Sequence, residues 1–131
     1  MPVDLKKFNK DLRAATSKMI PEQVELVKKK VGMQLLERLV MMTPVDTGRA
    51  RSNWFVTLDT PSSAVATNPP FPSASVTIND GANIISLVSG GQSIWISNNL
   101  PYIEPLENGW SSQAPAGMLA VALAEVGSQF T

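Results

Sequence analysis

Cysteine and histidine are both absent from the 131-residue sequence. This excludes disulfide bonds, Cys or His nucleophiles and bases, haem ligation through these residues, and the ordinary zinc sites. The longest apolar stretch, Ala114–Ala124, covers about eleven residues, too few to cross a bilayer. Met1–Lys7 lacks the apolar segment of a secretory signal. The composition therefore predicts a soluble chain, assembled in the cytosol, without catalytic, metal-binding or cofactor-binding residues.

Basic residues are absent from the second part of the chain. All eleven Lys and Arg residues lie between Lys6 and Arg51. Residues 1–51 carry a net charge of +5 and residues 52–131 a net charge of −5, so the whole chain is neutral. A neutral chain has little general attraction for nucleic acid or anionic membranes. Three explanations of the asymmetry stay open: the basic half binds nucleic acid, it meets the acidic half of another copy, or the charges pair within one fold.

Apolar spacing predicts two helices in residues 1–42. The first runs from Asp4 to about Met19, and the second opens at Pro21 and continues to Met42. The second helix carries apolar residues on two sides, namely Val24, Val27, Val31, Leu35, Leu39 and Met42 on one, and Met33, Leu36 and Val40 on the other. It therefore needs two partners. One is the sheet, and the other is the first helix, the C-terminal helix or another subunit.

Residues 43–110 are predicted to be rich in strands. Alternating apolar residues favour three strands, over Asn53–Leu58, Ser75–Asn79 and Ser93–Ser97, with Trp54 and Trp95 in the sheet core. Ala82–Ser89 fits either a strand or a helix, and we favour a helix that ends at Gly90–Gly91. The Pro-rich segment 60–73 has no periodicity, which is typical of a functional or mobile loop.

A last, buried helix is predicted over residues 114–128, opening at Pro115. The order of helices, then strands, then a helix predicts an α+β fold. We expect a single domain, 1–131, with two N-terminal helices, one of them long, a small and mostly antiparallel sheet, and the buried C-terminal helix.

Few residues suggest chemistry. Glu104 and Glu107 lie three residues apart, and paired carboxylates can hydrolyse glycosides, but nothing else in the sequence indicates a sugar cleft. We interpret them instead as a surface or interface pair that meets Arg49 or Arg51. Lys28–Lys30 are consecutive helical residues that point about 100° apart, so they do not form one basic patch. Trp110, in a polar loop, is a candidate interface anchor.

Two blocks of sequence resemble a known family. The first is Thr43-Pro44-Val45-Asp46-Thr47-Gly48-Arg49, directly after the long helix. The second extends from Ser97 to Met118 and contains Leu106-Glu107-Asn108-Gly109-Trp110-Ser111. Together the blocks resemble the lambdoid-phage neck and tail-completion (minor tail component) family of tailed bacteriophages. The arrangement of helices and strands extends the likeness to most of the chain.

The resemblance implies a non-enzymatic virion protein at the head–tail junction, assembled in the host cytoplasm. Copies would form a ring, commonly sixfold, that joins tail to head between a neck adaptor and tail-terminator or tail-tube proteins. DNA would pass through the lumen without specific binding. A tail-terminator ring that caps the tail tube is one alternative. A small nucleic-acid-binding module that uses the basic N-terminal half is another, of a different class.

The resemblance also implies roles for individual residues. Pro44, Asp46 and Gly48 would build the corner between helix and strand. Arg49, with Arg51 beside it, would pair with Glu104 or Glu107 within or between subunits. A second corner, before the last helix, would be shaped by Tyr102, Leu106, Glu107, Gly109 and Trp110.

Overall fold

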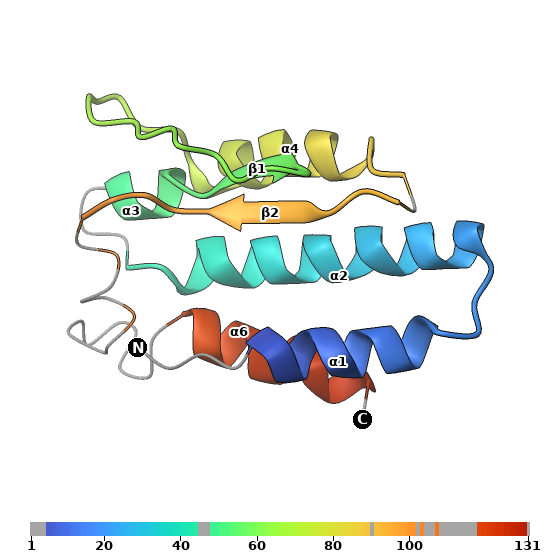
Figure 1. Ribbon diagram of the computed structural model, residues 1–131. Coiled ribbons are helices and arrows are strands. Elements are labelled where there is room, and N and C mark those ends of the chain that lie inside the picture. The colour runs from blue at the N-terminus through green and yellow to red at the C-terminus, as the bar shows by residue number, and fades with distance from the viewer. Residues whose placement is uncertain are drawn as a thin grey trace.

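The computed structural model describes residues 5–44, 48–89, 91–101, 103, 107 and 118–130. Their elements, in chain order, are α1 (Leu5–Thr16), α2 (Pro21–Met42), α3 (Arg49–Ser52), β1 (Phe55–Leu58), α4 (Ala74–Ile85), β2 (Ile94–Ser97), α6 (Leu119–Gly127) and a 3₁₀ turn (Ser128–Phe130). In Figure 1, α2 runs through the middle, with α1 and α6 on one side and the strands, α3 and α4 on the other. The fold is α+β, as predicted.

The central helix, α2, begins and ends where the sequence predicts. Pro21 occupies its first turn, where its missing N–H has no helical partner to lose. The Ile20 N–H donates to Gln23 Oε1 at 3.3 Å and so closes the entry. At the other end, Thr43 adopts extended backbone (φ −69°, ψ 132°), because a residue that precedes proline avoids the helical region.

The predicted burial of α2 on two sides is confirmed. Leu36, Leu39 and Val40 belong to the main core. The other buried members of that core are Trp54, Val56, Ile85, Met118 and Ala122. Val31, on another side of α2, packs in a second cluster with Phe8 of α1 and with Leu123 and Val126 of α6. The partners of α2 are therefore the sheet and α4 on one side, and α1 and α6 on the other.

The two strands form an antiparallel pair in which Phe55 lies opposite Ser97 and Leu58 opposite Ile94. Val56 and Trp54 are each 8% exposed, as the strand pattern predicts. Trp95, in contrast, is 43% exposed, so its predicted place in the core is wrong. It pairs with Thr57, and alternation puts both residues on the face of the sheet opposite to Val56.

The strand predicted over Ser75–Asn79 is wrong, because these residues belong to α4. Ser73 caps this helix, with its Oγ accepting from the Val76 N–H at 3.2 Å. The buried residues of α4 are Thr77, Gly81 and Ile85, which recur every four residues as a helix requires. The alternating valine and isoleucine of this segment suggested a strand. The segment is instead helical, and the helix packs its buried stripe against α2 and β1.

Other boundaries differ in smaller ways. The predicted helix over Ala82–Ser89 is the end of α4, which stops at Ile85. The short helix α3 was not predicted, and α1 ends at Thr16 rather than near Met19. The last helix ends at Gly127, as predicted, while its predicted opening at Pro115 lies outside the described residues.

Candidate functional site

The first sequence block lies at the C-terminal end of α2, where the chain turns towards β1. Thr43 Oγ1 accepts from Trp54 Nε1 at 2.8 Å and donates to the Leu39 carbonyl. This buried pair ties the start of β1 to the end of α2. Pro44 is buried, and Gly48 has a φ of +74° ahead of α3, a conformation that favours glycine. Asp46 lies outside the described residues.

The two arginines of α3 are half-buried beside this corner. Arg51 Nη2 donates to the Met41 carbonyl at 3.2 Å and so reaches back to the last turn of α2. Arg49 or Arg51 is predicted to pair with Glu104, which lies outside the described residues, or with Glu107. That pairing stays a prediction.

Glu107 holds the beginning of α6. Its Oε1 accepts from the backbone N–H groups of Met118 at 2.8 Å and Leu119 at 2.6 Å, and its Oε2 accepts from Ala120 at 3.0 Å. A carboxylate is favoured at this position, because the first N–H groups of a helix lack partners and carry partial positive charge. Glu107 is 8% exposed, so its predicted place on the surface is wrong: its carboxylate is buried in a structural contact with the helix.

The described residues of the second block contact the elements on either side of the first block. Asn98 Nδ2 donates to the Ala50 carbonyl of α3 at 3.0 Å. Met118, at the end of the block, is fully buried against the C-terminal half of α2. The second block therefore lies against the elements that flank the first block, although the two blocks are about fifty residues apart in the sequence. The remaining predicted residues of the second block, namely Tyr102, Glu104, Leu106, Gly109 and Trp110, lie outside the described part.

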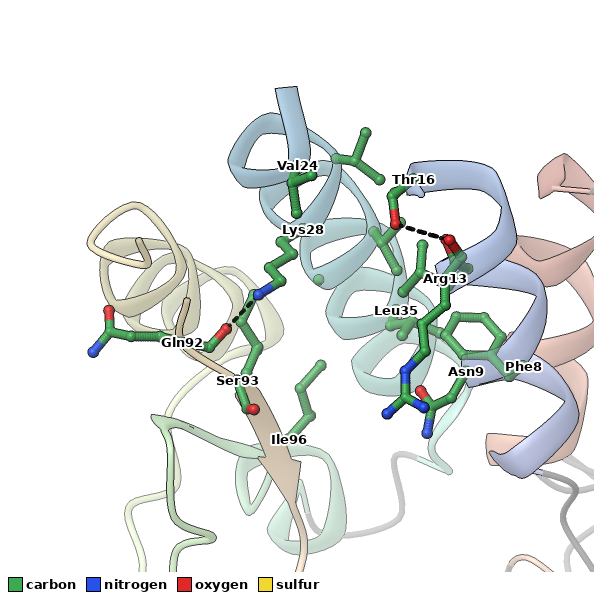
Figure 2. Close-up of a pocket in the computed structure, with 15 residues that line it drawn as sticks. Phe8, Asn9, Arg13, Thr16, Val24, Lys28, Leu35, Gln92, Ser93 and Ile96 are labelled. Atoms are coloured by element: carbon green, nitrogen blue, oxygen red, sulfur yellow. Dashed lines mark hydrogen bonds between the residues drawn. The ribbon is translucent and has the colours of Figure 1, made fainter. Parts of the chain in front are cut away.

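A groove lies between α1 and β2, with α2 as its floor (Figure 2). It has a volume of about 340 Å³, and its floor carries Val24, Val27 and Val31. Arg13 and Lys28 are its charged lining residues, and no carboxylate lines it. Lys28 Nζ reaches from α2 to the residue two before β2 and donates to the Gln92 carbonyl at 2.8 Å (Figure 2). The groove is therefore apolar at the bottom and cationic at its rim.

Residues 60–73, which we call the arm, extend past α3 at one end of the molecule (Figure 1). Asn53, which is completely buried, holds the arm by both backbone groups of Ala66. Its Nδ2 donates to the Ala66 carbonyl at 2.9 Å, and its Oδ1 accepts from the Ala66 N–H at 2.8 Å. Asn99 Nδ2 donates to the carbonyls of Ser62 at 2.8 Å and Ala64 at 3.3 Å. The arm is thus fastened to the body.

Sequence reasoning missed the two asparagines and the capping role of Glu107. An asparagine that fastens a distant loop has no spacing signature, and Glu107 caps a helix that begins more than ten residues later. The basic run behaves as predicted where its contacts are visible. Lys28 turns to Gln92, whereas Lys29 Nζ pairs with Glu25 Oε1 at 3.1 Å on the same helix.

Searches for related proteins gave no match to any family model, curated protein or solved structure. Among the described residues, no group of His, Cys, Asp and Glu could hold a metal ion. Within the same residues, none of the helices has both the length and the hydrophobicity of a membrane span.

Proposed function

We propose that the chain is a structural protein of a tailed-bacteriophage virion, at the head–tail junction, where copies form a ring that joins tail to head. The observation that carries the proposal is that residues of the second family-like block contact α3 and α2, the elements on either side of the first block. Asn98 links the second block to α3, and Glu107 uses its carboxylate to build α6. These contacts give the matching residues architectural roles.

The charge distribution also supports assembly from copies. Arg38 Nε pairs with Glu125 Oε2 at 3.0 Å and so links the basic half to the acidic half. Lys7 and Lys29 instead pair with Asp11 and Glu25, inside the basic half. A ring needs two different patches that meet between neighbours. Opposite charges on the two halves favour that contact and disfavour contacts between like patches.

The proposal is tested by the particles that the purified chain forms. Light scattering after size-exclusion chromatography should show an oligomer, and negative-stain microscopy should show rings with a central lumen. Added to purified phage tails that lack their completion protein, the rings should occupy the end that meets the head. A chain that remains monomeric and never decorates tails would contradict the proposal. Rings on tail tubes that stop tube growth would favour the tail-terminator alternative.

A gel shift with DNA at several salt concentrations tests the nucleic-acid alternative. Binding through phosphate contacts weakens steeply as salt rises, because counterions are released on binding. We expect no such binding at physiological salt. A tight complex with a steep salt dependence would favour the nucleic-acid-binding module.

A further inference from the structure

The first observation is an edge of β2 that has no strand partner among the described residues. The sheet contains β1 and β2 in its described part. The Asp59 N–H donates to the Ser93 carbonyl at 2.8 Å, so these two residues are a hydrogen-bonded pair. In an antiparallel ladder such pairs alternate with pairs that are not hydrogen-bonded to each other. Ile94 and Ile96 accordingly direct their backbone N–H and carbonyl groups away from β1. Both residues line the groove, so this edge of β2 forms one of its walls.

Nothing in the sequence of β2 protects that edge. Proteins usually guard an exposed edge with a charged side chain, a proline or a bulge, whereas β2 reads Ile-Trp-Ile-Ser. The edge is recessed instead, because α1 stands on the opposite side of the groove (Figure 2). A whole sheet from another molecule would meet α1 before it reached β2. The groove therefore suits a slender, extended segment.

The second observation is another unpaired extended edge, on the arm. The backbone groups held by Asn99 and Asn53 belong to Ser62, Ala64 and Ala66. Contacts at every second residue are typical of an extended chain with one edge turned towards the body. The residues between them, Ser63, Val65 and Thr67, direct their backbone groups to the other side. Ser63, Val65 and Thr67 are exposed.

The two edges belong to different parts of the molecule. Because Asn53 and Asn99 fasten the arm to the body, it does not reach the groove of its own chain. The arm contains no charged side chain and mostly small residues, so it enters a narrow groove without burying a charge. Its free carbonyls are suitable acceptors for Arg13 at the rim of the groove.

We propose that residues 62–67 of one copy add as a strand to the free edge of β2 in the groove of a second copy. Main-chain hydrogen bonds supply the contact, as in other cases of strand addition. Arm and groove are different patches, so the contact passes from each copy to the next and closes into a ring where the rotation allows. The inference rests on the proposed self-assembly and names the contact that makes it.

Disulfide crosslinking tests the contact cleanly, because the chain has no cysteine. Ser63→Cys marks the arm and Ser93→Cys the groove, and both serines are exposed. The two single variants are mixed and oxidised, so every disulfide formed is intermolecular. We expect crosslinks between the S63C and S93C proteins, with few between two copies of the same variant. Ser75→Cys, at an exposed position of α4, is the control, and we expect it not to crosslink with either.

A backbone test uses Val65. Val65→Pro removes an N–H from the free edge of the arm and leaves the atoms that Asn53 and Asn99 hold unchanged. We expect the dissociation constant between copies to rise about fivefold to tenfold for each main-chain hydrogen bond that the substitution removes. Val65→Thr keeps the N–H and the shape of the side chain, so it should associate like the unmodified chain.

The outcomes separate this contact from the proposed function. Rings that form without S63C–S93C crosslinks and tolerate V65P would overturn the arm-and-groove contact and leave the virion proposal standing. Crosslinks between two S63C or two S93C copies would point to a twofold contact and also overturn it. A chain that neither crosslinks nor associates, alone or with tails, would overturn both. The crosslinking experiment does not use V65P, so it tests the contact even if that variant fails to fold.

Discussion

Gly81 lies at the closest approach between α4 and its neighbours. A Cβ on this residue would lie 2.8 Å from Val56 Cγ2 and closer still to Leu36 Cδ2. Both side chains are buried in the main core. The absence of a side chain at this residue is what lets α4 pack directly on α2 and β1.

We expect Gly81→Ala to lower the free energy of unfolding by about 1–3 kcal/mol, because overpacking a filled core costs more than the better helix propensity of alanine returns. Urea denaturation followed by circular dichroism measures the change. Gly91→Ala is the matched control, since nothing lies within 4 Å of the added Cβ. Equal stabilities of G81A and the unmodified chain would contradict the close packing seen here.

Glu107 gives a second prediction at this scale. Replacing it with alanine removes the two oxygens that accept three hydrogen bonds from the N–H groups at the start of α6, and we expect a loss of about 1–2 kcal/mol in unfolding free energy. Glu107→Gln keeps one acceptor oxygen, so its unfolding free energy should lie between that of the alanine variant and that of the unmodified chain. Chemical denaturation of the three proteins gives the order. Glu37→Gln, at an exposed position of α2, removes a charge without a cap and should change stability by less than about 0.5 kcal/mol.

At the scale of the element, the arm depends on Asn53. This side chain both donates and accepts with Ala66 and also donates to the Arg49 carbonyl at 2.8 Å. Fourteen residues without regular structure usually tolerate many conformations. Here a buried amide supplies the hydrogen bonds that a neighbouring strand would otherwise supply.

Asn53→Asp tests that dependence, because a carboxylate accepts but cannot donate to the two carbonyls. We expect a loss of at least about 2 kcal/mol in unfolding free energy, since buried polar groups would be left unpaired. Limited proteolysis should also cut faster within residues 60–68. Asn79→Asp, at an exposed position of α4, is the control. An arm that resists protease as before would show that other contacts hold it.

At the scale of the whole molecule, the charge of the chain is segregated along the sequence, and Arg38–Glu125 is an ion pair that joins the two halves. We expect Arg49→Glu combined with Arg51→Glu to weaken association between copies by about tenfold or more, because the attraction to an acidic neighbour is removed. Light scattering against concentration measures the effect. Lys6→Glu combined with Lys10→Glu makes the same change in net charge on α1. If both double variants associate alike, total charge rather than the α3 corner controls assembly.

Local rules account for the parts of the fold that were predicted. Pro21 and Pro44 set the ends of α2 through the sterics of their own peptide units. The alternation of apolar residues predicted the bounds of β1 and β2 to within two residues, because side chains along a strand point to opposite faces in turn. The need of α2 for two partners followed from its two apolar sides. Each of these properties depends on residues a few positions apart, so it follows from the local sequence and does not require knowledge of the tertiary structure.

Long-range contacts account for the rest. The segment that begins α4 has the composition of a strand, and it is a helix because Gly81 fits against Leu36 and Val56. Trp95 is exposed because its side chain lies on the face of the sheet opposite to Val56 and the core. Glu107 and Asn53 act on backbone groups more than ten residues away. Such partners are chosen by packing, since a hydrogen bond or a close contact depends on distance in space rather than position along the chain.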